Sequence, residues 1–255
     1  MNSNGKEIER LLDIMDQLLS PQGCPWDREQ SHESLARYLI EESYEVIEAI
    51  KQQSMEELRD ELGDVLLQVV FHAALAKRSG HFDFAQVVKR VADKMIQRHP
   101  HVFSTMQLES SEEVMNHWES FKRKEGKKTV LSGIPSMLPA LMRAEKIQEK
   151  AARVGFDWPS PEGAMDKLKE EIEEFNKASS HQQRQEEMGD ILFAAVNLSR
   201  LYHIDPEAVL QDSNQKFIRR FNYIEEQLAK KGAKPEQCSL EAMDRLWEEA
   251  KTKGL

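Results

Sequence analysis

The sequence has few of the residues that build disulfide-rich, β-sheet or membrane-spanning proteins. Its 255 residues include two cysteines, eleven glycines and 7% aromatic residues. Two cysteines provide neither a disulfide framework nor the ligand spacing of a zinc site. The longest nearly apolar run, VLLQVVFHAALA at 65–76, is too short to span a bilayer, and the amino terminus lacks the apolar core of a signal peptide. We therefore expect a cytoplasmic protein that does not cross a membrane.

Positive charge is also in the minority. The 45 acidic and 35 basic residues give a formal net charge of −10. This balance argues against nucleic acid or an anionic membrane surface as the main partner. A few local lysines and arginines can still bind a small anion, and an acidic protein that handles phosphates is expected to use a divalent cation.

Helical periodicity, in contrast, is abundant. Apolar residues recur at spacings of three and four in the segments IERLLDIMDQLL, SLARYLIEESYEVIEAI, MEELRDELGDVLLQVVFHAALAK and FAQVVKRVADKMIQRH. The short breaks between these segments contain Pro, Gly or Ser, as turns between helices do. Sustained alternation with a period of two is scarce, so the sequence predicts an all-α fold.

The second half of the chain repeats the first. In the same order, EESYEV at 41–46 returns as EEIEEF at 170–175, ELGDVLL at 61–67 as EMGDILF at 187–193, KMIQR at 94–98 as KFIRR at 216–220, and WESFK at 118–122 as WEEAK at 247–251. Such a series indicates an internal duplication. It predicts two tandem helix-bundle domains, at 1–121 and 137–255, joined by a linker at 122–136.

Each half carries two acidic motifs on consecutive helices. Helical spacing places Glu42 on a stripe that we expect to be buried, made of Leu35, Leu39, Val46 and Ile50. Glu171 lies in the same way between Leu168 and Phe175. Clustered carboxylates with little water around them either hold protons or repel one another, and a bound cation resolves this conflict. Oxygen ligands suit Mg²⁺ or Mn²⁺. The predicted metal ligands are Glu42, Glu45, Glu61 and Asp64 in the first half, and Glu171, Glu174, Glu187 and Asp190 in the second.

Two other interpretations of the acidic motifs are possible. Taken alone, an ExxE motif in so acidic a chain is a solvated helix face, but the inward phase and the second copy favour a metal site. A di-iron bundle needs Glu-x-x-His on two helices. The sequence has one such spacing, from Glu29 to His32, which lies outside both acidic helices, so di-iron is disfavoured.

The pattern EExxE followed by ExxD resembles the signature of the all-α nucleoside triphosphate pyrophosphohydrolases. The tandem arrangement, with GCPWD at 23–27, RHPHVF at 98–103 and VGFDW at 154–158, is similar to the MazG family over nearly the whole chain. The resemblance implies a homodimer that binds nucleoside triphosphates such as ATP and cleaves them, with Mg²⁺, to a monophosphate and pyrophosphate. It also implies that Lys216 and Arg220 contact the triphosphate and that Trp247 lies at the nucleotide.

Physical chemistry agrees with these implied roles. Cleavage at the α-phosphorus develops negative charge that metal ions and Lys or Arg side chains neutralise, and a metal-bound water is a better nucleophile at neutral pH. Glu170 or another glutamate of the cluster could take the proton of that water. An indole stacks on a base without reading its edge, which favours broad base tolerance. Alternatively, Lys216 and Arg220 form a solvated edge, and Trp247 packs in the core.

The two halves differ around the acidic motifs. Lys167 stands one helical turn before Glu171, where the first half has Tyr38, and Arg219 stands where the first half has Gln97. We therefore expect the second half to carry most of the activity. Two other functions stay open, namely a narrower dNTP pyrophosphatase and a helical nucleotide- or metal-sensing module without turnover.

Overall fold

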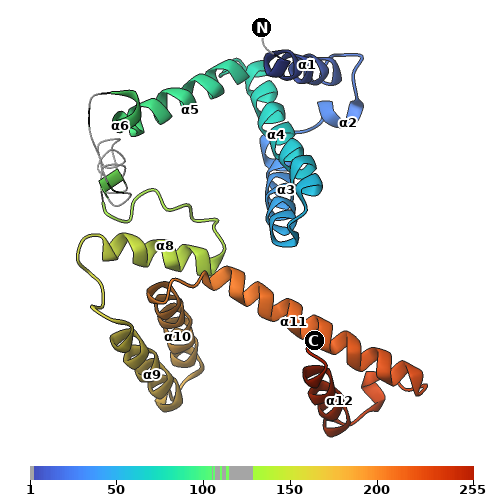
Figure 1. Cartoon of the computed structure of the whole chain (residues 1–255), viewed down its shortest axis with the longest axis vertical. Helices are drawn as coiled ribbons and strands as arrows, with labels where there is room; N and C mark the ends of the chain where they lie inside the picture. Colours follow the sequence, from blue (N-terminus) through green and yellow to red (C-terminus); the bar gives the residue numbers. More distant parts are fainter. Residues whose placement is uncertain (1–2, 105, 107–109, 111–112, 115–128) are drawn as a thin grey trace. The chain divides into compact units, whose positions relative to one another are not determined.

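The computed structural model describes residues 3–104, 106, 110, 113–114 and 129–255, and every regular element within these residues is a helix (Figure 1). The prediction of an all-α fold is confirmed. The chain divides into two compact units, Met1–Phe121 and Lys122–Leu255. The WESFK segment of the repeat, at 118–122, lies outside the described residues, as does 122–128 of the expected linker, and the limits of that linker stay a prediction.

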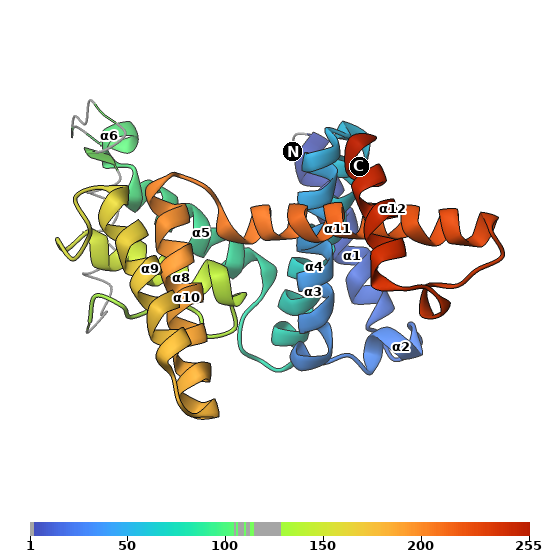
Figure 2. The same ribbon diagram turned by 90° about the horizontal axis from the view of Figure 1, so that it is seen from below.

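The first unit is built around an antiparallel pair of long helices. Its elements are α1 (Ser3–Leu18), α2 (Pro25–Arg28), α3 (His32–Gln52), α4 (Met55–Arg78), α5 (Phe84–Arg98) and α6 (Pro100–Phe103). Helices α3 and α4 lie side by side in both Figure 1 and Figure 2. Their two-residue connection works because Gln53 adopts a left-handed φ of 57° after α3 and the Ser54 hydroxyl caps α4.

The core of the first unit lies where α1 meets this pair. Its buried members are Met15, Leu19, Leu35, Val70, Phe71 and Leu75. The expected buried stripe of α3 was only partly right, because Leu39 and Ile50 are 37% and 55% exposed. In the described chain α3 packs chiefly against α4, so only part of the stripe is covered.

The second unit repeats the helix pair. Its elements are α8 (Ala140–Ala152), α9 (Pro161–Lys177), α10 (His181–Leu201), α11 (Pro206–Lys230), the 3₁₀ turn η1 (Pro235–Gln237) and α12 (Leu240–Thr252). Helices α9 and α10 pack together as α3 and α4 do, α8 packs on α10, and α12 packs on α11. Ser180 begins α10 with a capping box, in which its hydroxyl accepts from the Gln183 N–H. No helix among the described residues is long and apolar enough to cross a bilayer.

Candidate metal and nucleotide site

Three carboxylates of the second unit converge between α9 and α10. Oxygen atoms of Glu171 on α9 and of Glu187 and Asp190 on α10 all lie within 4.8 Å of one another. Glu171 is only 6% exposed, as its helical phase predicted, whereas Asp190 is exposed. The two motifs meet because a three-residue connection folds α10 back along α9.

Glu174 lies outside this group of three and is exposed. It is still close enough to matter electrostatically. Desolvation raises the pKa of Glu187, and the negative charges of Glu174, Glu171 and Asp190 raise it further. All four predicted carboxylates of the second half therefore influence one another, although three form the compact cluster.

Lys167 on α9 forms an ion pair with this cluster. Its Nζ lies 2.7 Å from Oε1 of Glu170 and 2.7 Å from Oε1 of Glu171. These hydrogen bonds raise the pKa of Lys167, so the ammonium stays charged at neutral pH. Glu170 is thus paired with a cation.

The first unit holds a corresponding carboxylate cluster, with Tyr38 at the position that matches Lys167. Oxygen atoms of Glu42, Glu45 and Glu61 lie within 4.8 Å of one another, while Asp64 is exposed and outside the group. Desolvation raises the pKa of Glu42, and the charges of Asp64, Glu45 and Glu61 add to the effect. Tyr38 stands one turn before Glu42, and its hydroxyl accepts from Arg37.

Both clusters fit a hard divalent cation. Their donors are carboxylate oxygens, which Mg²⁺ and Mn²⁺ prefer. The raised pKa values of Glu42, Glu61 and Glu187 express the cost of crowding negative charge in partly desolvated positions, and a cation would remove that cost.

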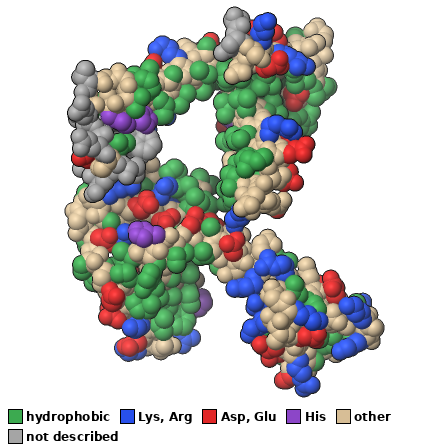
Figure 3. Space-filling model, viewed as in Figure 1, with side chains coloured by type: hydrophobic (Ala, Val, Ile, Leu, Met, Phe, Trp, Pro, Cys, Tyr) green, Lys and Arg blue, Asp and Glu red, His purple; other side chains and the backbone are tan. Residues whose placement is uncertain are grey.

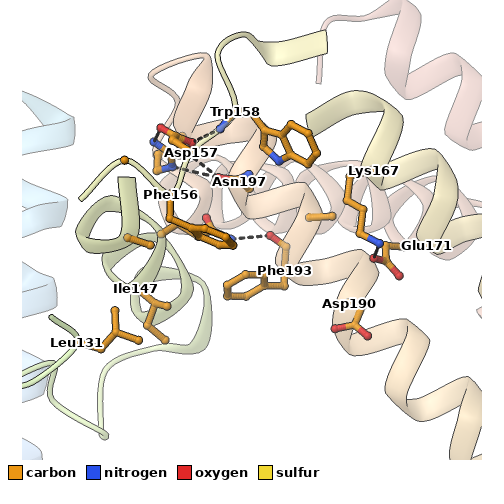
Figure 4. A pocket seen from close by; sticks show the side chains of 15 residues that line it. Leu131, Ile147, Phe156, Asp157, Trp158, Lys167, Glu171, Asp190, Phe193 and Asn197 are labelled. Carbon is orange, nitrogen blue, oxygen red and sulfur yellow. Dashed lines mark hydrogen bonds and ion pairs between the residues drawn. The ribbon is translucent and has the colours of Figure 1, made fainter. Parts of the chain in front are cut away.

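A cavity of about 680 Å³ opens beside the cluster of the second unit (Figure 4). Lys167, Glu171 and Asp190 line one end of it. The rest is lined mainly by apolar and aromatic side chains together with a few polar ones: Leu131, Ile147, Gln148, Ala151, Gly155, Phe156, Asp157, Trp158, Phe193, Ala194, Asn197 and Arg200.

The turn after α8 supplies one wall of this cavity. Gly155 has a φ of +88°, and the N–H groups of Gly155 and Phe156 bond back to carbonyls of the last turn of α8. This turn places Phe156, Asp157 and Trp158 at the cavity. This role of the VGFDW motif was not predicted from the sequence, where the motif served only as a landmark, although the motif itself was the available signal.

The predicted phosphate and base ligands on α11 and α12 lie elsewhere in the second unit. The Trp247 ring is 5.1 Å from that of Phe217 and 5.4 Å from the guanidinium of Arg220. Nε of Arg220 donates to the backbone oxygen of Leu255 at 2.6 Å, and Lys216 and Arg219 are exposed. Among the described residues that line the cavity, none comes from α11 or α12.

Comparison with known proteins adds three findings. The family model described as the MazG nucleotide pyrophosphohydrolase domain matches residues 30–103 and again 159–224, one match in each unit. The chain is 45% identical, over 98% of both sequences, to the nucleoside triphosphate pyrophosphohydrolase/pyrophosphatase MazG of Thermotoga maritima. It is 44% identical to the nucleoside triphosphate pyrophosphohydrolase of Escherichia coli, over 96% of this chain and 97% of that one.

A solved structure is also similar, the crystal structure of a mazG-related protein from Thermotoga maritima. It is 34% identical and covers 45% of this chain and 98% of its own, with a TM-score of 0.40.

Proposed function

The chain belongs to the family of MazG nucleotide pyrophosphohydrolases, and from this premise we propose that its second unit hydrolyses nucleoside triphosphates to a monophosphate and pyrophosphate with Mg²⁺ as cofactor. One observation carries the assignment to the second unit: its carboxylate cluster lies at the end of a cavity of about 680 Å³ that also contains a lysine. Mn²⁺ is an alternative cofactor, because it accepts the same oxygen ligands.

The acidic residues of α9 and α10 would hold the cation. Glu171, Glu187 and Asp190 are its proposed ligands, with Glu174 as a fourth. The metal would supply positive charge for the phosphate oxygens and a lower pKa for water. In the first unit Glu42, Glu45 and Glu61, with Asp64 beside them, form the equivalent set, which we propose to be the less active one.

The remaining roles fall to charged side chains around the cluster. Lys167 would neutralise phosphate oxygens, since its ammonium lies at the carboxylate end of the cavity. Glu170, held 2.7 Å from Lys167, is a candidate to accept a proton from water once the lysine engages phosphate.

We also propose that the active form is a homodimer. Ile172, Met188 and Leu192 are 45%, 42% and 53% exposed, and hydrophobic side chains cover much of the visible face of α9 and α10 (Figure 3). Lys216, Arg219, Arg220 and Trp247 do not line the cavity of their own unit. A second copy would cover the apolar face and bring these side chains to the nucleotide.

A matched pair of substitutions tests the assignment. Glu187→Gln and Glu61→Gln change the same position of the two repeats, and each removes one charge of a carboxylate cluster. We expect Glu187→Gln to lower the rate of Mg²⁺-dependent pyrophosphate release by at least about 100-fold and Glu61→Gln to leave it within about threefold of wild type. The reverse ranking would place turnover in the first unit. A wild-type protein that releases no pyrophosphate from any common NTP or dNTP would contradict the proposed function itself.

A further inference from the structure

The cavity of the second unit has two chemically different ends. In Figure 4, Lys167, Glu171 and Asp190 lie at one side and Asp157 and Asn197 at the other, with the rings of Trp158 and Phe193 between them. The charged end suits a cation and phosphates. The other end combines aromatic rings with amide groups, which is the chemistry that contacts the faces and the edge of a heterocycle.

The side-chain amide of Asn197 is held in one orientation. Its Oδ1 accepts hydrogen bonds from Nε and Nη2 of Arg200, at 3.1 Å and 2.8 Å. Because the oxygen faces the guanidinium, the other end of the amide is the NH₂ group, a donor. Within the described residues this NH₂ group has no hydrogen-bond partner, and Asn197 lines the cavity.

Asp157 fixes Arg200 in turn. Its two carboxylate oxygens accept from the two terminal nitrogens of the guanidinium, with Nη1 at 3.0 Å from Oδ2. The guanidinium is thus shared between Asp157 from the VGFDW turn and Asn197 from α10. The side chains of Arg200 and Asp157 are 13% and 26% exposed, so this bidentate contact is partly shielded from water.

A second amide in the cavity wall leaves an acceptor without a partner. Gln148 is 7% exposed, and its Nε2 donates to the backbone oxygen of Phe193 at 2.8 Å. Its Oε1 is buried and has no hydrogen-bond partner in the described chain. An unpaired buried acceptor is unfavourable, and core packing alone would not call for an amide at this position.

The first unit lacks this equipment at the matching positions. Aligning ELGDVLL with EMGDILF places Phe71 opposite Asn197 and Ala74 opposite Arg200. Phe71 is 4% exposed and belongs to the hydrophobic core. Polar groups stand in the second unit where the first has packed side chains, and core packing alone would not call for them.

This inference rests on the proposed function. We propose that Asn197 binds the base of the nucleotide, and that its Nδ2 donates a hydrogen bond to an acceptor on the edge of the base. Phe193 and Trp158 contact the faces of the base. Arg200 and Asp157 are positioning residues that aim this donor. Every common base carries an acceptor on its edge, so one donor separates nucleotides from base-free triphosphates without selecting a single base.

The test compares nucleotides with a triphosphate that has no base. Pyrophosphate release from ATP, GTP, CTP, UTP and ribose 5-triphosphate is measured for the full chain with Mg²⁺. We expect Asn197→Ala to raise KM for the four nucleotides about threefold to tenfold, with kcat within about twofold, and to leave KM for ribose 5-triphosphate unchanged. Equal changes for both kinds of substrate, or none for either, would overturn the proposal.

Two further variants guard against a change in folding alone. Asn197→Asp keeps the oxygen that faces Arg200 and loses the donor, and we expect the same selective rise in KM. Asn176→Ala, at an exposed asparagine of α9 outside the cavity, is the matched control and is expected to behave as wild type. Arg200→Ala combined with Asn197→Ala is expected to add little to the KM of Asn197→Ala alone, because the two residues act through one hydrogen bond. Full additivity would contradict the positioning role.

Binding of nucleosides separates this proposal from the proposed function. Adenosine, guanosine, cytidine and uridine at millimolar concentration are followed by saturation-transfer NMR without metal. Binding by wild type that weakens in Asn197→Ala supports the base site even if no pyrophosphate is ever released. Absence of binding, or binding that is unaltered by the substitution, overturns it even if the enzyme is active.

Discussion

His72 in α4 illustrates how burial sets the charge of one side chain in the first unit. Its Nδ1 lies 2.8 Å from Nδ1 of His32, and the two rings are stacked with centroids 5.1 Å apart. Two such nitrogens share a single hydrogen, so at least one ring must be neutral there. Desolvation lowers the pKa of His72, and the charge of His32 lowers it further.

The depressed pKa of His72 predicts a specific pH dependence of stability. The unfolded chain takes up this proton near pH 6.5 and the folded chain only at lower pH, so the stabilising contribution is complete above pH 6.5 and is lost as pH falls. We expect the free energy of unfolding, measured by urea unfolding, to decrease less for His72→Gln than for wild type when the pH falls from 7.5 to 5.5. His81→Gln, at an exposed histidine, is the control. Equal slopes for His72→Gln and wild type would refute the effect.

Individual residues also show which features of the site can be predicted from the sequence. The inward phase of Glu171 followed from its spacing to Leu168 and Phe175, because helical periodicity is local. Asn197, Arg200 and Asp157 were missed, because they come from α10 and from the turn after α8 and meet only through tertiary packing. Leu39 and Ile50 were expected to be buried, but periodicity does not say which neighbour covers a stripe or how much of it.

At the scale of elements, the turns that follow α1 and α8 use glycine for different reasons. Gly23 has no room for a side chain, since a Cβ would lie 2.0 Å from the backbone oxygen of Leu18. Gly155 has open space around it and needs glycine only for its φ of +88°. The helix pairs themselves were predictable from the acidic motifs and the short connections, whereas this difference between the turns depends on backbone contacts.

Glycine substitutions should therefore rank by steric conflict. We expect Gly23→Ala to lower the free energy of unfolding by about 2 kcal/mol or more, because backbone must move, and Gly155→Ala by about 1 kcal/mol. Gly63→Ala, inside α4 with open space around its Cα, should be neutral or raise stability by up to about 1 kcal/mol. Urea unfolding at pH 7 measures all three. Equal losses for Gly23 and Gly155 would mean that the turn after α1 can relax.

At the scale of the whole molecule, the duplication gives two units with similar helix pairs that differ in the side chains at matching positions. The family match to both units confirms the tandem arrangement that the repeated motifs predicted. Whether a second copy contributes residues to the site could not be predicted from the sequence motifs, because they carry no information on whether a neighbouring segment belongs to the same chain.

The homodimer can be tested at its exposed apolar face. We expect Ile172→Glu to shift the protein from dimer to monomer in light scattering at micromolar concentration, because it would bury a charge in the interface, and to lower turnover with it. Met137→Glu, at a residue that is 91% exposed outside the helices, should leave the dimer intact. A wild-type protein that is monomeric and fully active would contradict the proposal.

If nucleotide binds in the cavity of the second unit, as proposed, the lifetime of this protein would depend on its supply of substrate. A ligand that binds only the folded state raises the free energy of unfolding in proportion to the logarithm of its concentration. Phe71 fills the first unit with core packing at the position of Asn197, so nucleotide would stabilise the second unit more than the first, and the second unit would be least stable when nucleotide is scarce. Proteases that act on unfolded chains would then remove the enzyme fastest when there is little for it to hydrolyse.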